Sequence, residues 1–164
     1  MKEEFVARIR ENERIIFKVC KIYCRNSEDE QDLFQDIVLQ LWRSFPSFRK
    51  ESKLSTWMYR IALNTAITQL REEKRKPKQQ GIDQEILQMP GAASDTKDEN
   101  FTLMMKAMDT LSKVEKAIMV LYLEDHSYRE MAEVMGMTES NIGFKINQIK
   151  NKLKITVNIL NYGA

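Results

Sequence analysis

Five side chains near the C-terminus have the chemistry to contact DNA. At 100° per residue they share the outward side of a predicted helix, opposite an apolar stripe. Hydroxyl and amide groups can hydrogen-bond base edges in a major groove, and neighbouring lysines can neutralise phosphate. Taken alone, an ordinary amphipathic helix with a solvated face explains the pattern about equally well. The five are Ser140, Phe144, Asn147, Gln148 and Asn151, and the flanking cations are Lys145, Lys150, Lys152 and Lys154.

A predicted helix-turn-helix over residues 127–153 would position this face. Ser127 and Glu130 fit a capping box that opens a short helix. Gly136 supplies the left-handed residue for a sharp turn, and Thr138 can cap the helix that follows. One apolar stripe recurs along this second helix at Ile142, Ile146, Ile149, Leu153, Val157 and Leu160. The complete pattern favours DNA binding over a solvated helix.

Acidic residues gather at the start of a helix predicted from Ser27 to about Ser44, with Ser27 and Glu30 as its capping box. A helix dipole favours carboxylates in the first turn. It does not explain the acids farther along, which share a face with Gln35 and an apolar residue. That mixed face could dock a basic surface of another protein. It comprises Asp32, Gln35, Asp36 and Leu39, and Trp42 extends the apolar body of the helix.

Basic and aromatic residues interleave over residues 48–76. Such a mixture suits single-stranded nucleic acid, because cations follow the backbone and rings stack on bases. A solvated helix with core aromatics is an equally good explanation of this segment alone. The residues are Phe48, Arg49, Lys50, Lys53, Trp57, Tyr59, Arg60, Asn64, Thr65, Thr68 and Arg71.

The composition is that of a globular chain, with 43% hydrophobic and 30% charged residues. The net charge of +2 gives no global argument for nucleic acid, but residues 49–76 hold eight basic and three acidic residues. The N-terminus lacks a signal peptide's apolar region, and no apolar run could span a membrane. We therefore expect a cytoplasmic protein, without membrane insertion. Cys20 and Cys24 are predicted to be buried thiols. The chain has one histidine and no phosphate-binding loop, so we do not expect an enzyme, a metal site or a cofactor.

Helical periodicity and an absence of strand-like alternation predict an all-α fold. Helices are expected over 3–25, over 27–44, and from Ser55 until Pro77 stops the third. Residues 77–100 show no sustained period and are acidic, which predicts a flexible linker. Residues 101–164 return to helix, with Ser112 and Glu115 as another capping box. The expected organisation is two helical domains, 1–76 and 101–164, joined by the linker 77–100.

The segments DLFQDIVLQLWRSFPSFRKESKLSTWMYRIALNTA and SYREMAEVMGMTESNIGFKINQIKNKL together resemble bacterial sigma factors of the sigma-70 family, most closely the extracytoplasmic-function (ECF) group. The resemblance covers nearly the whole chain. It implies a transcription initiation factor that binds core RNA polymerase and directs it to promoters. Its first domain would recognise and melt the −10 element, and its second would read the −35 element. The linker would thread the polymerase channel. An anti-sigma factor is a further partner that the group suggests.

By position, the resemblance assigns three sets of residues. Polymerase binding falls on Asp32, Gln35, Asp36, Leu39 and Trp42. Contacts to the −10 element fall on Phe48, Arg49, Lys53, Ser55, Thr56, Trp57, Arg60, Asn64 and Thr65, and the loop 48–55 would capture a flipped base. Contacts to the −35 element fall on Arg129, Ser140, Gly143, Phe144, Lys145, Asn147, Gln148 and Asn151.

The sequence departs from the common family pattern in two places. Lys50 stands where a glycine often occurs, and Gly143 and Phe144 replace the usual basic or polar pair of the recognition helix. The alternative to a sigma factor is a stand-alone helix-turn-helix regulator. That class needs neither an acidic docking face nor an aromatic-basic loop. A helical adaptor protein would use the acidic face but leave the lysine-flanked helix unexplained.

Overall fold

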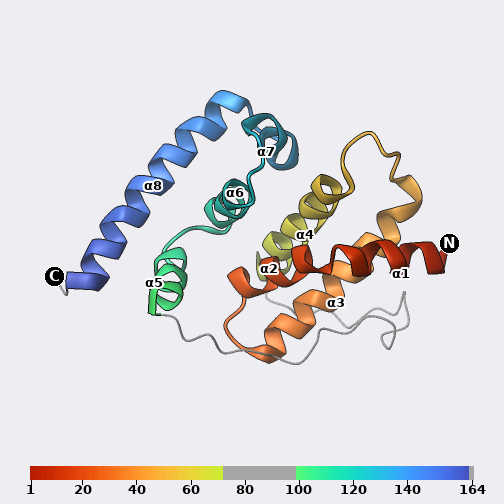
Figure 1. Cartoon of the computed structure of the whole chain (residues 1–164), viewed down its shortest axis with the longest axis horizontal. Coiled ribbons are helices and arrows are strands. Elements are labelled where there is room, and N and C mark those ends of the chain that lie inside the picture. The colour runs from red at the N-terminus through yellow and green to blue at the C-terminus, as the bar shows by residue number, and fades with distance from the viewer. Residues whose placement is uncertain (72–98, 163–164) are drawn as a thin grey trace. The chain divides into compact units, whose positions relative to one another are not determined.

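Helices form both parts of the chain in the computed structural model, which describes residues 1–71 and 99–162 (Figure 1). Across these two ranges there is no β-strand, so the predicted all-α class is confirmed. The chain divides into two compact units, Met1–Ala92 and Ala93–Ala164. The linker predicted over 77–100 lies outside the described residues, except for its last two residues, which already belong to a helix. We use N-terminal domain for residues 1–71 and C-terminal domain for residues 99–162.

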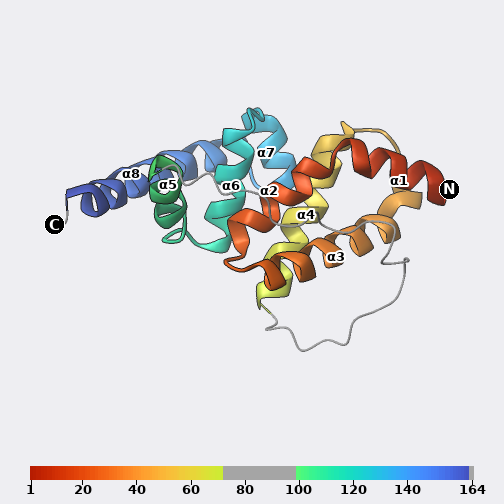
Figure 2. The same ribbon diagram turned by 60° about the horizontal axis from the view of Figure 1, so that its bottom comes forward.

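Five helical elements build the N-terminal domain: α1 (Lys2–Glu11), α2 (Glu13–Tyr23), α3 (Ser27–Ser44), the 3-10 turn η1 (Phe45–Ser47) and α4 (Leu54–Arg71). Helices α2, α3 and α4 pack against one another, as Figures 1 and 2 show. Their contact faces supply the large, fully buried side chains of the core: Ile16, Leu33, Phe34, Ile37, Leu41, Met58 and Leu63. This packing fixes α3 and α4, the two helices on which most predicted site residues of this domain lie.

The single helix predicted over 3–25 is wrong, because the chain breaks at Asn12. Its backbone leaves the helical region at φ −123° and ψ 20°, and its side-chain amide donates to the carbonyl of Arg8 at 2.9 Å. Asparagine commonly ends a helix by bonding nearby backbone groups. Helical periodicity concealed the break, because apolar residues recur at helical spacing from Phe5 in α1 to Ile16 in α2, and both of these side chains are fully buried.

The capping box predicted for Ser27 and Glu30 is also wrong. Asn26 caps α3, with its side-chain oxygen accepting from the backbone N–H of Asp29 at 2.8 Å. Glu30 instead forms an ion pair with Lys21 of α2 at 3.3 Å and is only 8% exposed. One of the acidic residues gathered at the start of α3 therefore ties this helix to α2.

Four helices form the C-terminal domain: α5 (Glu99–Met108), α6 (Lys113–Leu123), α7 (Tyr128–Met135) and α8 (Glu139–Tyr162). The long helix α8 packs against the other three. Both capping boxes predicted here, at Ser112 and at Ser127, are confirmed. Gly136 adopts φ 68°, and the hydroxyl of Thr138 accepts from the N–H of Asn141 at 3.1 Å. Helices α7 and α8 thus form the predicted helix-turn-helix.

Burial along α8 follows the predicted stripe for its first three turns. Ile142, Ile146 and Ile149 are fully buried, while Leu153 is half-buried and Leu160 is 43% exposed. The shorter helices therefore anchor the N-terminal half of α8, where the residues predicted to contact the −35 element lie.

Cys20 in α2 and Cys24, which follows that helix, are buried free thiols, as predicted. Burial raises the pKa of both, that of Cys24 to about 11, with nearby carboxylates adding to the effect. Because a thiol reacts as its thiolate, these side chains behave as small core residues.

Candidate nucleic-acid and polymerase interfaces

The outward face of α8 presents its polar residues to solvent. Ser140, Asn147, Gln148 and Asn151 are exposed, and Phe144 is 61% exposed. Phe144 therefore does not pack internally. The buried stripe behind these residues holds the exposed amides in a row along one side of a rigid helix. Such a row has the donors and acceptors that base edges in a major groove require.

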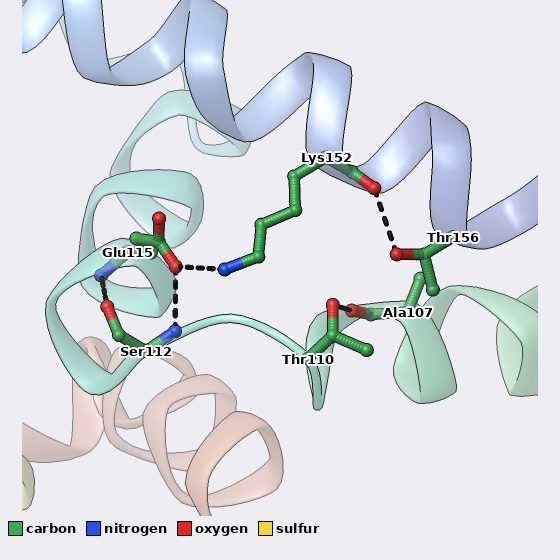
Figure 3. Close-up of polar contacts among 6 residues, drawn as sticks. All are labelled: Ala107, Thr110, Ser112, Glu115, Lys152 and Thr156. Carbon is green, nitrogen blue, oxygen red and sulfur yellow. Dashed lines mark hydrogen bonds and ion pairs between the residues drawn. The ribbon is translucent and has the colours of Figure 1, made fainter.

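The lysines beside this face have different surroundings. Lys152 forms an ion pair with Glu115 of α6 at 3.1 Å, as Figure 3 shows. The ammonium of Lys150 lies 4.4 Å from the ring centroid of Tyr122, also in α6, in a cation–π contact. Lys145 is half-buried. The sequence pattern treats these lysines alike, whereas the structure commits Lys152 to the protein's own α6.

Glu115 joins the start of α6 to α8. Its carboxylate accepts from the backbone N–H of Ser112 at 2.8 Å and from Lys152, while the Ser112 hydroxyl accepts from the Glu115 N–H (Figure 3). Partial burial raises the pKa of Glu115, but these hydrogen bonds and the lysine charge outweigh it, so its pKa is lowered. The carboxylate therefore stabilises the fold at neutral pH.

A pH dependence follows from that lowered pKa. A depressed folded-state pKa contributes stability that is present above the unfolded value, ordinarily 4.5, and is lost as the pH falls through the folded value. We expect Glu115→Gln to reduce the acid-induced loss of stability of the C-terminal domain below about pH 5. Thermal unfolding followed by backbone amide NMR of residues in α6 and α8 measures this. A wild-type pH slope in the variant would contradict it, and Asp125→Asn, at an exposed acid between α6 and α7, is the control.

Aromatic side chains form a continuous cluster beneath the predicted −10 loop. Phe5 meets Trp42 and Phe45 edge-on, at centroid distances of 5.1 and 5.3 Å. Trp57 lies 4.8 Å from Phe48 and 6.3 Å from Phe45, and is 8% exposed. Phe48, the first residue of that loop, is half-exposed, and its ring packs against the buried Trp57. The contribution of Phe5 was not predicted; its place in the apolar stripe indicated burial, but not this partner.

The loop and the start of α4 divide into exposed and buried positions. Arg49, Lys53 and Asn64 are exposed, and Ser55, Arg60 and Thr65 are half-buried. Thr56 is only 2% exposed. The Thr65 hydroxyl already donates to the Ile61 carbonyl at 2.7 Å. Of the predicted −10 residues, the two loop cations and Asn64 are thus the most open to a nucleic acid, while Thr56 and Trp57 help to build the surface beneath.

The acidic face of α3 is partly accessible. Asp32, Gln35 and Asp36 are half-buried, and Asp36 accepts a hydrogen bond from the side-chain amide of Gln69 in α4. Leu39 is 8% exposed and belongs to the core. Trp42 is half-buried against Phe5. The polar members of the predicted docking face therefore remain at the surface, and its apolar members support them from within.

Two family models match this chain at the two domains. Sigma-70 region 2 matches residues 8–76, and Sigma-70, region 4 matches residues 101–153. The chain belongs to the sigma-70 family. Among curated relatives, the ECF RNA polymerase sigma-E factor of Haemophilus influenzae is 32% identical over 142 residues, covering 77% of this chain and 75% of the relative. The sigma-E factor of Escherichia coli is 30% identical over 144 residues, covering 78% and 75%. The ECF sigma factor SigM of Mycobacterium tuberculosis is 25% identical, covering 94% and 78%.

Solved structures share the fold of this sigma factor. The sigma factor RpoE of Bartonella quintana, in complex with the anti-sigma factor NepR, gives a TM-score of 0.69 at 18% identity, covering 96% of this chain and 98% of that one. CnrH, in complex with the cytosolic domain of CnrY, gives 0.66 at 15% identity, covering 96% and 90%. In the described ranges, no helix has the length and apolar character needed to cross a membrane.

The relatives and both region matches place the chain in the ECF group of sigma factors. It is a transcription initiation factor that directs RNA polymerase to promoters. The stand-alone regulator is not favoured, because the region 2 match accounts for the N-terminal domain that such a regulator would not need.

The structure shows the surroundings of both positions that depart from the family pattern, Lys50 and Gly143. The backbone of Lys50 is left-handed, with φ 59°, the conformation that glycine adopts without strain. The loop therefore keeps the turn that a glycine would favour, at a cost of roughly 1 kcal/mol. Gly143 is half-buried beneath the ring of Tyr128 in α7, a residue that sequence reasoning did not select. Residue spacing could not have linked Gly143 to Tyr128, because they lie on different helices.

Proposed function

We propose that the N-terminal domain carries the polymerase-docking and −10 surfaces, and that α8 reads the −35 element in the major groove. The observation that carries this proposal is the row of exposed amides on α8, backed by a buried stripe and preceded by a capped helix α7. A recognition helix needs this combination of rigidity and exposed hydrogen-bonding groups. Arg129, exposed in the first turn of α7, would contact the DNA backbone.

For the −10 element, we assign base capture to the loop 48–55. Half-exposed Phe48 offers a stacking surface, with Arg49 and Lys53 beside it for phosphate. Asn64 would reach bases from α4. Extruding a base costs a few kcal/mol, and the aromatic support of Trp57 under Phe48 would let the loop offset that cost without rearranging.

For polymerase docking, we assign Asp32, Gln35 and Asp36 to the contact surface, with Leu39 and Trp42 as its packed support. We further propose that the chain acts in the cytoplasm with core polymerase, has no catalytic activity of its own and needs no cofactor. An anti-sigma factor is a candidate regulator, by analogy with the complexes formed by RpoE and CnrH.

Run-off transcription with reconstituted holoenzyme tests the proposal. Purified chain and core polymerase are given a library with randomised −35 and −10 segments, and the transcribed templates are sequenced. We expect two enriched elements at a fixed separation. Tight duplex binding by the chain alone, with no association with core polymerase, would instead support the stand-alone regulator.

Replacing Asn147 by alanine is expected to reduce the preference of the holoenzyme for its selected −35 element by about tenfold. An asparagine that pairs with a base edge contributes roughly 1 to 3 kcal/mol of discrimination. Competition between the selected duplex and one with a scrambled −35 segment measures the change. Asn158→Ala is the matched control, because Asn158 is exposed on the same side of α8 but lies beyond the region 4 match. Equal effects of both variants would remove Asn147 from the reading face.

A further inference from the structure

A small pocket lies between the start of α1 and the segment that follows α3. Its volume is about 210 Å³. Pockets for drug-sized ligands begin at roughly 300 Å³, so this one suits a single planar ring system. Its lining combines apolar side chains with charged ones. The apolar residues are Phe45, Pro46 and Phe48, and the charged residues are Glu4, Arg8 and Lys50.

Buried aromatic rings hold two of the apolar lining residues in place. Phe45 packs edge-on against Phe5 of α1, with ring centroids 5.3 Å apart, and Phe48 packs against Trp57 at 4.8 Å. Phe5 is fully buried and Trp57 is 8% exposed. The aromatic side of the pocket is therefore formed before a ligand arrives. Aromatic rings stack on nucleobases, because every base has a π-face.

The charged side of the pocket comes mainly from α1. Glu4 and Arg8 lie one turn apart on this helix and form an ion pair at 3.3 Å. The residues that directly follow them, Phe5 and Ile9, are fully buried and fix α1 beside the pocket. The Glu4 side chain remains 57% exposed, so its carboxylate can still accept from a ligand. The positive charges of Arg8 and Lys50 outweigh this carboxylate, so the pocket does not repel a nucleic-acid strand.

A carboxylate distinguishes the bases by their exocyclic amines. Adenine, cytosine and guanine each carry one, whereas thymine carries a carbonyl oxygen in its place. A carboxylate accepts a hydrogen bond from an amine but has no proton to donate to a carbonyl. In an extruded base, the edge that pairs in the duplex is free to be read in this way.

We propose that Glu4 is a specificity-determining residue for the −10 element, which admits a base with an exocyclic amine to this pocket and rejects thymine. Arg8 is a positioning residue that holds the Glu4 carboxylate through their ion pair. The proposal rests on the proposed function that the loop 48–55 captures a base. It adds the start of α1 to that site, because Glu4 lies outside the loop and precedes the region 2 match.

Selection from a promoter library with a randomised −10 segment tests the role of Glu4. Holoenzyme made with full-length chain transcribes the library, and the transcribed templates are sequenced. We expect wild type to exclude thymine at one position of the element. Glu4→Gln should admit thymine there about tenfold more often, because a hydrogen bond with a charged group is lost and an amide can donate to the carbonyl of thymine.

Glu3→Gln is the matched control for this selection. Glu3 is exposed on the same turn of α1 and loses the same charge, but its side chain does not line the pocket. Its selected −10 segment should equal that of wild type. The role of Glu4 would be overturned if Glu4→Gln also selected the wild-type segment, or if both variants admitted thymine equally.

Removing the amine from the DNA gives a second measurement. The selected base is replaced, in an otherwise unchanged promoter, by its analogue without the exocyclic amine. This should weaken binding by wild-type holoenzyme about tenfold and binding by Glu4→Gln holoenzyme only about threefold, because a neutral acceptor gains less from the amine. Equal losses in both would show that another group reads the amine, and would overturn the proposal.

Two variants at Arg8 test its positioning role in the same library. Arg8→Gln breaks the ion pair and should admit thymine about threefold more often, at the same position as Glu4→Gln. Arg8→Lys keeps the charge and should retain the discrimination against thymine. A wild-type selection by Arg8→Gln would overturn the role of Arg8.

These outcomes are distinguishable from failure of the proposed function. If wild-type holoenzyme showed no base preference anywhere in the −10 segment, the assignment of base capture to the loop 48–55 would be wrong. If that preference is present but wild type admits thymine at every position, only the role of Glu4 is wrong.

Discussion

Replacing Phe34 by alanine is expected to lower the free energy of unfolding of the N-terminal domain by about 3 to 5 kcal/mol. Phe34 is fully buried in α3 and stacks on Phe17 of α2, with ring centroids 5.4 Å apart. Its removal leaves a cavity between the helices that carry the proposed docking and −10 surfaces. Because a typical domain is stable by only 5 to 15 kcal/mol, this loss would also reduce promoter-dependent transcription at physiological temperature.

Tryptophan fluorescence makes this measurement specific to one domain. Both tryptophans of the chain, Trp42 and Trp57, lie in the N-terminal domain, so denaturant titration of the full chain reports its unfolding alone. Phe144→Ala is the control, because that ring is 61% exposed in the other domain and should leave the fluorescence midpoint unchanged. A loss below 1 kcal/mol for Phe34→Ala would mean that the α2–α3 contact is not a packed core.

The sequence predicted best those features that depend on a few adjacent residues. Ser112 with Glu115, and Ser127 with Glu130, bond within one turn, so residue type and a spacing of three are sufficient. Gly136 is similar, because a left-handed turn between two apolar stretches strongly favours glycine. These local signals placed α6, α7 and α8, and with them the exposed face of the recognition helix.

Local rules failed where two candidates stood side by side. Asn26 and Ser27 are both good caps, and each is followed three residues later by an acid. Asn26 is the cap, which leaves Glu30 to pair with Lys21 across the helices. At Asn12, the apolar period continued through a break that only the backbone reveals. In both places the local preferences for beginning or ending a helix are weak, and tertiary packing decides between the neighbouring residues.

Contacts between side chains of different helices could not be predicted from the sequence. Lys152 and Glu115 are 37 residues apart and lie on different helices, so the periodicity of a single helix cannot pair them. Thr56 was predicted to contact the −10 element and Leu39 to belong to the docking face, yet both side chains are nearly buried. Likewise, the ring over Gly143 comes from another helix. Contacts between helices decide these cases, and residue spacing within one helix does not encode which residues of another helix it meets.

Reversing the charge at Asp36 is expected to weaken association with core polymerase by about a hundredfold. Removing one partner of a charge pair at an interface costs roughly 2 to 5 kcal/mol, and an arginine adds repulsion from a basic docking surface. Binding of full-length chain to core polymerase, measured by fluorescence anisotropy at fixed salt, tests this. The neighbouring Asp32→Arg should have an effect in the same direction, because both carboxylates lie on one face of α3.

Gln69→Ala separates docking from packing. The Gln69 amide donates to Asp36 from α4, so this variant breaks the same interhelical hydrogen bond while leaving the acidic face its charge. We expect its polymerase affinity to stay within about threefold of wild type, since a neutral partner is lost and not the carboxylate. If both variants lost affinity equally, Asp36 would act by holding α3 against α4. If a folded Asp36→Arg variant bound core polymerase normally, the docking face would lie elsewhere. Weak binding by Asp36→Arg alone would locate the contact on the surface of α3.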